Sequence, residues 1–405
     1  MHAEGYDPEV IDRLCGGTGI LRYPSRTFGA QELRTADPIT QRLGAVRIRI
    51  AREAADDPDV RRVHLRWDGG AIELQPSKGL SIGPYTHRGW RPFWEPVVHG
   101  VLSPDREDLA GPVLVHGESV PGLRWIENFS GCIELLGLSN WGMPRTDGKT
   151  GRTLPLHGEA ARIPVDSLSI TAAGTMILVS SSFLLNSRWW MEDPLSGPWY
   201  RRGRSDWRIT RTVLISTEHT CLQLVDSLEN IGDLPAVPRW GYHLQLRAEA
   251  GSRLLIPSRT AEARSGEQDL PGDYQFWRPA GDPTVREERG YVHKGLPTAP
   301  GPFDTPVVQG SARYASGPST RFTMPAAAYT LSWFSCGGAE SLEFALPDTP
   351  RTSMMPSGWD GMGPEIGVDP LDHGGTIDPE INHPPVAPGG ATRLYLRIEQ
   401  GDDLS

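Results

Sequence analysis

Residues 125–144 read Trp125-Ile-Glu-Asn-Phe-Ser-Gly-Cys-Ile-Glu-Leu-Leu-Gly-Leu-Ser-Asn-Trp-Gly-Met-Pro144, and residues 156–165 read Leu156-His-Gly-Glu-Ala-Ala-Arg-Ile-Pro-Val165. Glycines recur in both segments, and His157 stands between a leucine and a glycine. Glycine lets the backbone turn tightly and approach another group closely. We therefore expect these two segments to bring an imidazole and the backbone close to a ligand.

The sequence on either side of these segments has the alternation of β-strands. Residues 63–67 and 71–75 alternate apolar and polar side chains, and Asp68-Gly69 between them is a hairpin signal. The chain also contains 46 glycines and 37 prolines, which interrupt helices. The pattern predicts an all-β sandwich with few short helices. Further strands are expected at residues 45–50, 175–179, 207–215, 220–228, 239–247, 330–334, 341–346 and 393–399.

No linker is evident, so we expect one large domain over residues 61–405, with residues 1–60 as an N-terminal extension packed on it. Within the extension, residues 7–14 are expected to form a short helix with Asp7 as N-cap and Pro8 at its first position. Three segments rich in glycine and proline are expected to be long loops: residues 76–100, 257–320 and 347–390.

The strand at 239–247 carries an unusual polar face. Alternation puts Tyr242, Leu244 and Leu246 on one face and His243, Gln245 and Arg247 on the other. Three polar groups in register suit a ligand-facing side of a sheet. His87 and Arg88, in the loop after residue 76, are a second candidate pair for substrate binding, and Trp141 offers an indole face of the kind on which sugars stack.

Composition excludes several functional classes. The formal net charge of −10 and the scattered arginines argue against a nucleic-acid binder. The four cysteines, at 15, 132, 221 and 336, form no CxxC pair, which argues against a zinc ribbon or a dithiol redox centre. We find no signal peptide and no apolar run long enough to span a membrane, so a cytoplasmic protein with free thiols is expected.

Two further segments leave alternatives open. Residues 186–206 form a polar and aromatic insertion, which would be either a lid or an arm that packs on a second subunit of a homo-oligomer. The Asp- and His-rich residues 360–383 could hold a divalent cation, but they match no EF-hand or zinc spacing, and a solvated acidic loop is the simpler interpretation. We therefore predict neither a metal nor a cofactor.

The two opening segments resemble the signature of aldose 1-epimerase-like proteins of the galactose mutarotase superfamily. The resemblance covers roughly residues 75–400, and three elements carry it: Leu156-His157-Gly158 with Arg162 nearby, Asp226 to Gly232, and His243. It implies a large antiparallel β-supersandwich that binds a small carbohydrate. It also implies an exchange of α and β anomers through the open-chain aldehyde, which needs an acid at the ring oxygen and a base at the anomeric hydroxyl.

The resemblance assigns roles to particular residues. His243 would be the acid, while His157 and Arg162 would hold the substrate, with Arg88, His87, Gln245, Arg247 and Trp141 as further contacts. An acidic sugar is expected if the arginines converge.

The general base is the point of departure from the family. The family's glutamate falls on Leu346, and the nearest carboxylates are Glu343 and Asp348, of which Glu343 is the first candidate. Two alternatives to a mutarotase follow: a lyase or isomerase that acts beside a sugar carbonyl on the same scaffold, and a carbohydrate binder or sensor without catalysis.

Overall fold

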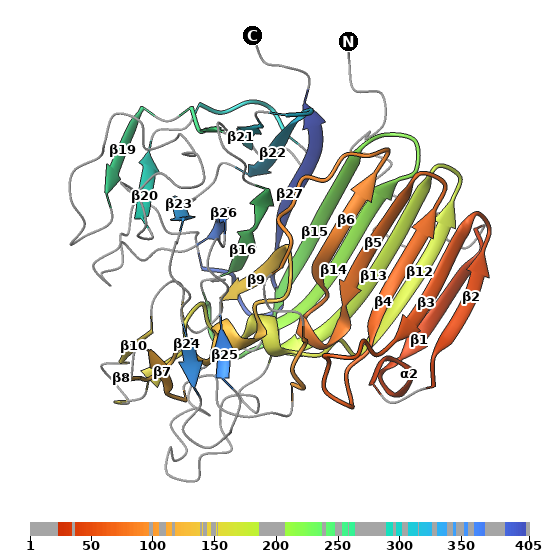
Figure 1. Ribbon diagram of the computed structural model, residues 1–405, viewed down its shortest axis with the longest axis horizontal. Helices are drawn as coiled ribbons and strands as arrows, with labels where there is room; N and C mark the ends of the chain where they lie inside the picture. Colours follow the sequence, from red (N-terminus) through yellow and green to blue (C-terminus); the bar gives the residue numbers. More distant parts are fainter. Residues whose placement is uncertain are drawn as a thin grey trace.

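The computed structural model shows a β-sandwich built from two large antiparallel sheets (Figure 1). The residues that the structure describes are 23–34, 37–96, 100–104, 111–115, 118–137, 140, 144–146, 151, 153–185, 207–236, 240–247, 253–257, 259–263, 289–294, 297–301, 307–314, 316–325, 330–337, 343–345, 352–354, 360–368 and 385–401.

One large sheet has nine described strands. In spatial order they are β1 (Ser25–Gly29), β12 (Ser167–Ala173), β13 (Met176–Leu185), β14 (Trp207–Ser216), β15 (Cys221–Asn230), β27 (Ala391–Gly401), β22 (Ser319–Pro325), β21 (Val307–Arg313) and β18 (Arg253–Leu255). Consecutive hairpins build its middle, where β14 and β15 pair from Trp207 opposite Asn230 to Ile215 opposite Leu222. The predicted hairpin at 207–228 is confirmed.

The other large sheet has twelve described strands and carries the residues of interest. Its order is β19 (Thr260–Ala263), β20 (Arg289–Lys294), β23 (Thr330–Gly337), β26 (Asp360–Val368), β16 (Trp240–Leu244), β9 (Ile133–Gly137), β6 (Ser81–His87), β5 (Gly70–Gln75), β4 (Arg62–Trp67), β3 (Val46–Ala51) and β2 (Ile39–Leu43). The short strand β17 (Leu246–Arg247) pairs with β26. The predicted hairpin through Asp68-Gly69 is confirmed as β4–β5.

Smaller elements complete the described fold. A four-stranded sheet contains β25 (Thr352–Met354), β24 (Glu343–Ala345), β7 (Val113–Val115) and β8 (Glu118–Val120), and β10 (Arg145–Thr146) pairs with β11 (Thr153–Leu154). The helical elements are α2 (Ala30–Arg34) and the 3-10 turns η2 (Pro76–Lys78), η3 (Arg124–Asn128) and η4 (Ala160–Arg162). Within the described part of the chain, no helix is long and apolar enough to cross a membrane.

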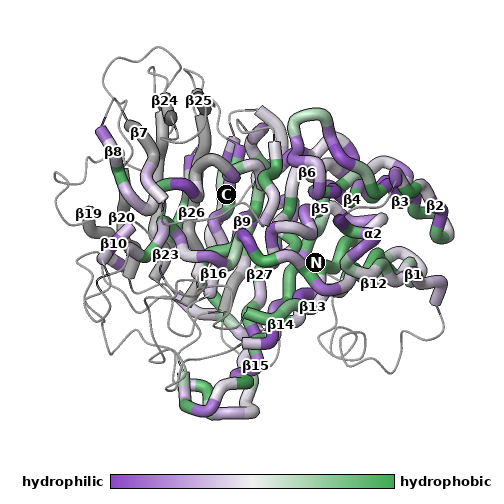
Figure 2. The backbone as a smooth tube through the Cα atoms, turned by 90° about the horizontal axis from the view of Figure 1, so that it is seen from below, coloured by the Kyte–Doolittle hydropathy of each residue, from purple (hydrophilic) through white to green (hydrophobic). Residues whose placement is uncertain are grey.

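The core lies between the two large sheets. Phe28 of β1, Ile48 of β3, Phe183 of β13 and Trp240 of β16 are fully buried in one hydrophobic cluster. Figure 2 shows hydrophobic residues interspersed with hydrophilic ones along the strands, as expected when each strand has an inner and an outer face. In Figure 1 the strands of the two sheets overlap in projection, and residues from both sheets belong to the one buried cluster.

One polar group inside this core ties β16 to the opposite sheet. Asp226 of β15 is fully buried and accepts two hydrogen bonds from Arg211, one from the indole of Trp240 at 2.8 Å and one from the hydroxyl of Tyr242 at 2.6 Å. A buried carboxylate is stable only when its oxygens are paired in this way. Asp226 thereby fixes the inner face of β16, and with it the direction of the outer face.

The structure differs from the sequence-based prediction in three places. The expected loop 76–100 contains β6, a strand in the interior of the twelve-stranded sheet, and the expected loop 347–390 contains β26. The segment 257–320 contains β19 to β22 rather than loop alone. The described residues before 61 supply strands at the edges of both large sheets, namely β1, β2 and β3. The helix expected at residues 7–14 and the insertion 186–206 lie outside the described residues.

Candidate active site

The strand β16 presents two different faces, as its alternation predicts. Trp240, Tyr242 and Leu244 point into the core between the sheets, where the first two bond to Asp226. His243 has the opposite parity and therefore lies on the outer face of the twelve-stranded sheet. It is only 9 % exposed, because other segments of the chain cover it.

His157 reaches the same place from a tight turn. Both His157 (φ 55°) and Gly158 (φ 77°) have left-handed backbone conformations, which are costly for a residue with a side chain. The amide of Gly137, at the end of β9, donates to the carbonyl of His157 at 2.9 Å. A Cβ at position 158 would lie 2.3 Å from the carbonyl oxygen of Gly137. The glycine thus permits a close approach between two backbone segments, which holds His157 beside β9.

The two imidazoles meet inside an aromatic cluster, which we call the histidine–aromatic site and define as Trp94, Trp125, Phe129, His157 and His243. The rings of His157 and His243 lie edge to face with centroids 5.1 Å apart. Trp125 lies 4.7 Å from His157 and 6.1 Å from His243, and Phe129 lies 5.2 Å from His243. Trp94 completes the cluster at 5.1 Å from Phe129. The structure therefore brings together His157 and His243, two of the three histidines that the sequence singled out.

Burial keeps both imidazoles neutral. It lowers the pKa of His243 to about 3, and burial together with the nearby His243 lowers the pKa of His157 well below 6.5. The side-chain amide of Gln245 contacts Nδ1 of His243. With the amide nitrogen as donor, Nδ1 is the acceptor and the ring proton is on Nε2. The predicted pairing of His243 and Gln245 on one strand face is thus found, and it orients the ring.

The strand register adds two glutamates to the neighbourhood of His243. Position 134 on β9 and position 365 on β26 both lie directly across from 243, one on each side. Residues directly opposite each other in an antiparallel pair share a face of the sheet. Three glycines share this face, at position 241 on β16 and at 363 and 367 on β26, and glycine leaves the face uncovered by a side chain.

The remaining predicted contacts on this side of the molecule have other partners. Arg162 is buried, and its guanidinium donates to the carbonyl of Ser103 at 3.2 Å. Arg247 lies over the ring of Tyr314, with 4.4 Å between the guanidinium carbon and the ring centroid, and donates to the carbonyl of Ser316. Arg162 and Arg247 thus both contact other parts of the protein, and the condition for an acidic sugar, a convergence of the arginines, stays untested.

Five predicted residues lie away from the histidine–aromatic site or outside the described residues. His87 ends β6, where its ring contacts Trp67 and hydrogen-bonds with the carbonyl of Thr217. Arg88 is an exposed turn residue next to it. Glu343 begins β24 in the four-stranded sheet, a different sheet from that of His243. Trp141 lies outside the described residues, as does Asp348.

The sequence reasoning did not single out Trp125, Phe129, Glu134 or Glu365 as site residues. Trp125, Phe129 and Glu134 lie in the opening segment, and their spacing around Gly131 gave no signal of which face each would take. Glu365 lies in Gly361-Met-Gly-Pro-Glu-Ile-Gly367, which has too few large apolar residues to show strand alternation. The register across β9, β16 and β26 reveals Glu134 and Glu365, and the ring contacts with the histidines reveal Trp125 and Phe129.

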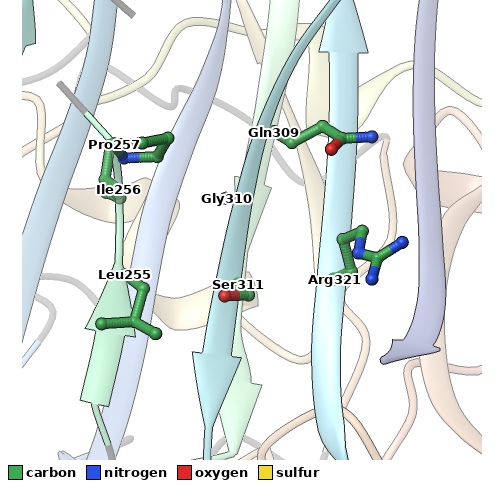
Figure 3. A pocket seen from close by; sticks show the side chains of 7 residues that line it. All are labelled: Leu255, Ile256, Pro257, Gln309, Gly310, Ser311 and Arg321. Atoms are coloured by element: carbon green, nitrogen blue, oxygen red, sulfur yellow. The ribbon is translucent and has the colours of Figure 1, made fainter. Parts of the chain in front are cut away.

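A separate pocket of about 340 Å³ opens on the nine-stranded sheet at β18, β21 and β22. Its lining, shown in Figure 3, consists of Leu255, Ile256, Pro257, Gln309, Gly310, Ser311 and Arg321. Arg321 is paired with Glu399 at 3.6 Å. This lining contains no histidine and no carboxylate, so the pocket lacks the acid–base groups that the histidine–aromatic site offers.

Known proteins resemble this protein in structure but not in sequence. No family model and no curated protein matches the sequence. Among solved structures, a candidate aldose 1-epimerase from Klebsiella pneumoniae matches with a TM-score of 0.66 over 93% of this chain and 87% of that chain, at 16% identity. A galactose 1-epimerase from Lactobacillus acidophilus matches with a TM-score of 0.48 over 90% of this chain and 100% of its own, at 11% identity.

At 16% identity the likeness to the Klebsiella protein concerns the fold alone. The predicted resemblance and the predicted fold class are confirmed on that level. The two large antiparallel sheets, and a match that covers 93% of this chain and 87% of that chain, show that this protein shares the fold of the Klebsiella structure.

Proposed function

We propose that this protein is a carbohydrate-active isomerase that catalyses anomer exchange of an aldose at the histidine–aromatic site. The observation that carries the proposal is the edge-to-face pair of His157 and His243, buried among aromatic rings on the outer face of the sheet. Aromatic rings give sugars apolar faces to pack on. The Klebsiella neighbour, described as a candidate aldose 1-epimerase, supports the same reaction class.

The reaction moves two protons and breaks one bond of the ring. A base removes the proton of the anomeric hydroxyl, the bond between C1 and the ring oxygen breaks, and the ring oxygen takes up a proton. Rotation about the C1–C2 bond followed by the reverse steps gives the other anomer. A site for this chemistry needs an acidic group at the ring oxygen and a base at the anomeric oxygen.

His243 is assigned to the ring oxygen. Its Nδ1 contacts the side-chain amide of Gln245, and with Nδ1 as the acceptor Nε2 carries the proton for the ring oxygen. A neutral imidazole donates a strong hydrogen bond to an oxygen that gains negative charge, as neutral histidines do in other isomerases. His157 would hold a second hydroxyl, since its ring lies 5.1 Å from that of His243.

Glu365 is the proposed base in place of Glu343. Position 365 lies directly across from His243 in the β16–β26 register, whereas Glu343 belongs to the four-stranded sheet. Adjacent positions across an antiparallel pair have Cβ atoms about 5 Å apart. Position 365 is therefore the neighbour of position 243 on the same face of the sheet.

The test is an assay of anomer equilibration with a freshly dissolved α-anomer for each of a panel of aldoses. We expect equilibration of at least one aldose to accelerate in proportion to enzyme concentration, with the sugar recovered unchanged. A new ultraviolet-absorbing unsaturated product would indicate instead a lyase that uses the same histidines. Saturable binding with neither change would indicate a carbohydrate sensor.

A further inference from the structure

Glu134 is a buried carboxylate beside the histidine–aromatic site, and one of its two oxygens has no hydrogen-bond partner among the described residues. It is fully buried on β9, directly across from His243. Its Oε1 accepts from the amide of Gly131 at 2.7 Å and forms a salt bridge with Lys78. Its Oε2 is buried and has no hydrogen-bond partner among the described residues. Buried polar atoms without partners are rare, and each calls for an explanation.

Lys78 holds this carboxylate in place. Its ammonium group is fully buried and has three acceptors: Glu134, the carbonyl of Asn128 at 2.5 Å and the hydroxyl of Ser130 at 3.2 Å. An ammonium group has three donors, so none remains for a ligand. Burial lowers the pKa of Lys78, and the charge of Glu134 acts in the opposite direction. The lysine therefore positions Glu134 and does not bind substrate.

Trp125 offers the complementary group. Its indole ring lies in contact distance of both histidines, and its Nε1 is buried without a hydrogen-bond acceptor in the described part of the structure. An indole N–H only donates, whereas a carboxylate oxygen only accepts. The donor Trp125 Nε1 and the acceptor Glu134 Oε2 thus lie near the two imidazoles without a hydrogen-bond partner among the described residues.

The charges around Lys78 do not favour an anionic ligand. Its charged neighbours are the cations Arg62 and Arg162 and the anion Glu134. Arg62 is in turn paired with Asp56 and Glu73, both buried. The three cations and three anions of this buried network balance, so no net positive charge is available to a sugar carboxylate or phosphate.

We propose that Glu134 Oε2 and Trp125 Nε1 are specificity contacts that bind hydroxyl groups of an uncharged sugar and reject anionic sugars. This inference rests on the proposed function. A hydroxyl group both donates and accepts, so it satisfies the carboxylate oxygen and the indole N–H. A carboxylate or phosphate has only acceptors to offer at neutral pH, and it would meet the negative charge of Glu134.

The test measures anomer exchange for four kinds of probe: a neutral aldohexose, its monodeoxy analogues, the corresponding uronate and the 6-phosphate. For the wild-type protein we expect kcat/KM to be about 100-fold lower for the uronate and the phosphate, and about 10- to 100-fold lower for the monodeoxy sugar that lacks the hydroxyl bound by Glu134.

The variant Glu134→Gln should lose about 10- to 100-fold with the neutral sugar and should no longer distinguish that monodeoxy analogue. Its preference against the uronate should fall to within about tenfold. Because this variant leaves Lys78 without a counter-charge, the double variant Lys78→Met/Glu134→Gln is measured beside it, and we expect the same pattern. Trp125→Phe keeps an aromatic ring but lacks the indole N–H. This variant should no longer distinguish the monodeoxy sugar that lacks the hydroxyl bound by Trp125.

Glu229→Gln, on an exposed ion pair with Arg208, is the matched control and should behave as wild type. The inference is overturned if wild-type protein exchanges the uronate as fast as the neutral sugar. It is also overturned if folded Glu134→Gln and the double variant keep the wild-type pattern across the probes; in both cases the proposed function stands. If wild-type protein accelerates exchange of no aldose, the proposed function fails, and this inference fails with it.

Discussion

His157 and His243 come from distant parts of the sequence, yet their rings meet edge to face with centroids 5.1 Å apart. Two separate devices produce this contact. The backbone of His157 is held to β9 by the amide of Gly137, and β16 is held to the opposite sheet through Trp240, Tyr242 and Asp226. The site thus depends on a glycine turn on one side and on a buried carboxylate on the other.

Glu365 and Glu343 are the two candidates for the general base. The strand register favours Glu365, whereas the sequence pattern favours Glu343. We expect Glu365→Gln to reduce kcat for anomer exchange by about 10²- to 10⁴-fold, because general base catalysis contributes that much. Glu343→Gln, in the four-stranded sheet, should stay within about threefold of wild type under this assignment. The two variants are compared in the same exchange assay. A large loss in Glu343→Gln and none in Glu365→Gln would reverse the assignment.

The buried histidines make stability depend on pH. The pKa of His243 is about 3 in the folded protein and about 6.5 in the unfolded chain. Between these values the unfolded chain binds a proton that the folded protein does not, so the free energy of unfolding falls as pH drops from 6.5 toward 3. Above pH 6.5 His243 is neutral in both states, so this loss of stability is absent there.

Urea unfolding of wild-type protein and His243→Gln at pH 7, 6 and 5 measures this effect. The free energy of unfolding of His243→Gln should fall less steeply with decreasing pH than that of wild type. The difference in slope should be about 1 kcal/mol per pH unit between pH 6 and 5, because one buried imidazole no longer titrates. His157→Gln should flatten the curve in the same direction. Parallel curves for all three proteins would show that these imidazoles are not buried in the neutral form.

Asp226 should contribute to stability far beyond a surface carboxylate. Asp226→Asn leaves the buried guanidinium of Arg211 without its counter-charge, and we expect a loss of about 3–5 kcal/mol in the free energy of unfolding. Tyr242→Phe removes only one of the hydrogen bonds to Asp226 and should cost about 1–2 kcal/mol. Urea unfolding gives both values. Equal losses in the two variants would mean that the ion pair adds nothing.

Substitutions at Gly158 and Gly174 distinguish the effect of a close backbone contact from the effect of a left-handed backbone conformation. Both have a left-handed conformation, but a Cβ at Gly174 meets nothing within 4 Å, whereas at Gly158 it would lie 2.3 Å from a carbonyl oxygen. We expect Gly174→Ala to cost about 1 kcal/mol and Gly158→Ala about 3 kcal/mol or more.

Gly158→Ala should also displace His157 and slow anomer exchange by about 10²-fold, since a shift of about 1 Å in a positioning group has that effect. Gly174→Ala serves as the control and should keep wild-type exchange. Thermal unfolding and the exchange assay measure both properties, and similar behaviour of the two variants would argue against the backbone contact with β9.

The sequence predicted much of the fold because alternation is a local property. Strands with large apolar residues at every second position, such as Trp207–Ser216 and Ala391–Gly401, were recognised from their pattern. Ser81–His87 and Asp360–Val368 were missed because glycine and proline interrupt that pattern. Both lie inside the large sheet, where neighbouring strands and not local preference decide the conformation.

The candidate site was predicted only in part for the same reason. His157 and His243 could be recognised from their own surroundings, a Leu-His-Gly turn and a polar strand face. Glu134 and Glu365 acquire their place from cross-strand register, which no single segment encodes. The sequence cannot show whether the arginines converge on a ligand, and in the structure Arg162 and Arg247 donate to protein carbonyls.

Exchange NMR is the most direct test of the proposal that the histidine–aromatic site catalyses anomer exchange. Saturation of one anomeric proton of an aldose, and observation of transfer to the other anomer, gives the exchange rate for wild-type protein, His243→Gln and His87→Gln. His87 is the matched control, since it contacts Trp67 and Thr217 away from the site. We expect transfer with wild type and His87→Gln and a loss of about 10²- to 10⁴-fold in His243→Gln. Undiminished transfer in folded His243→Gln would contradict the proposed role of the site.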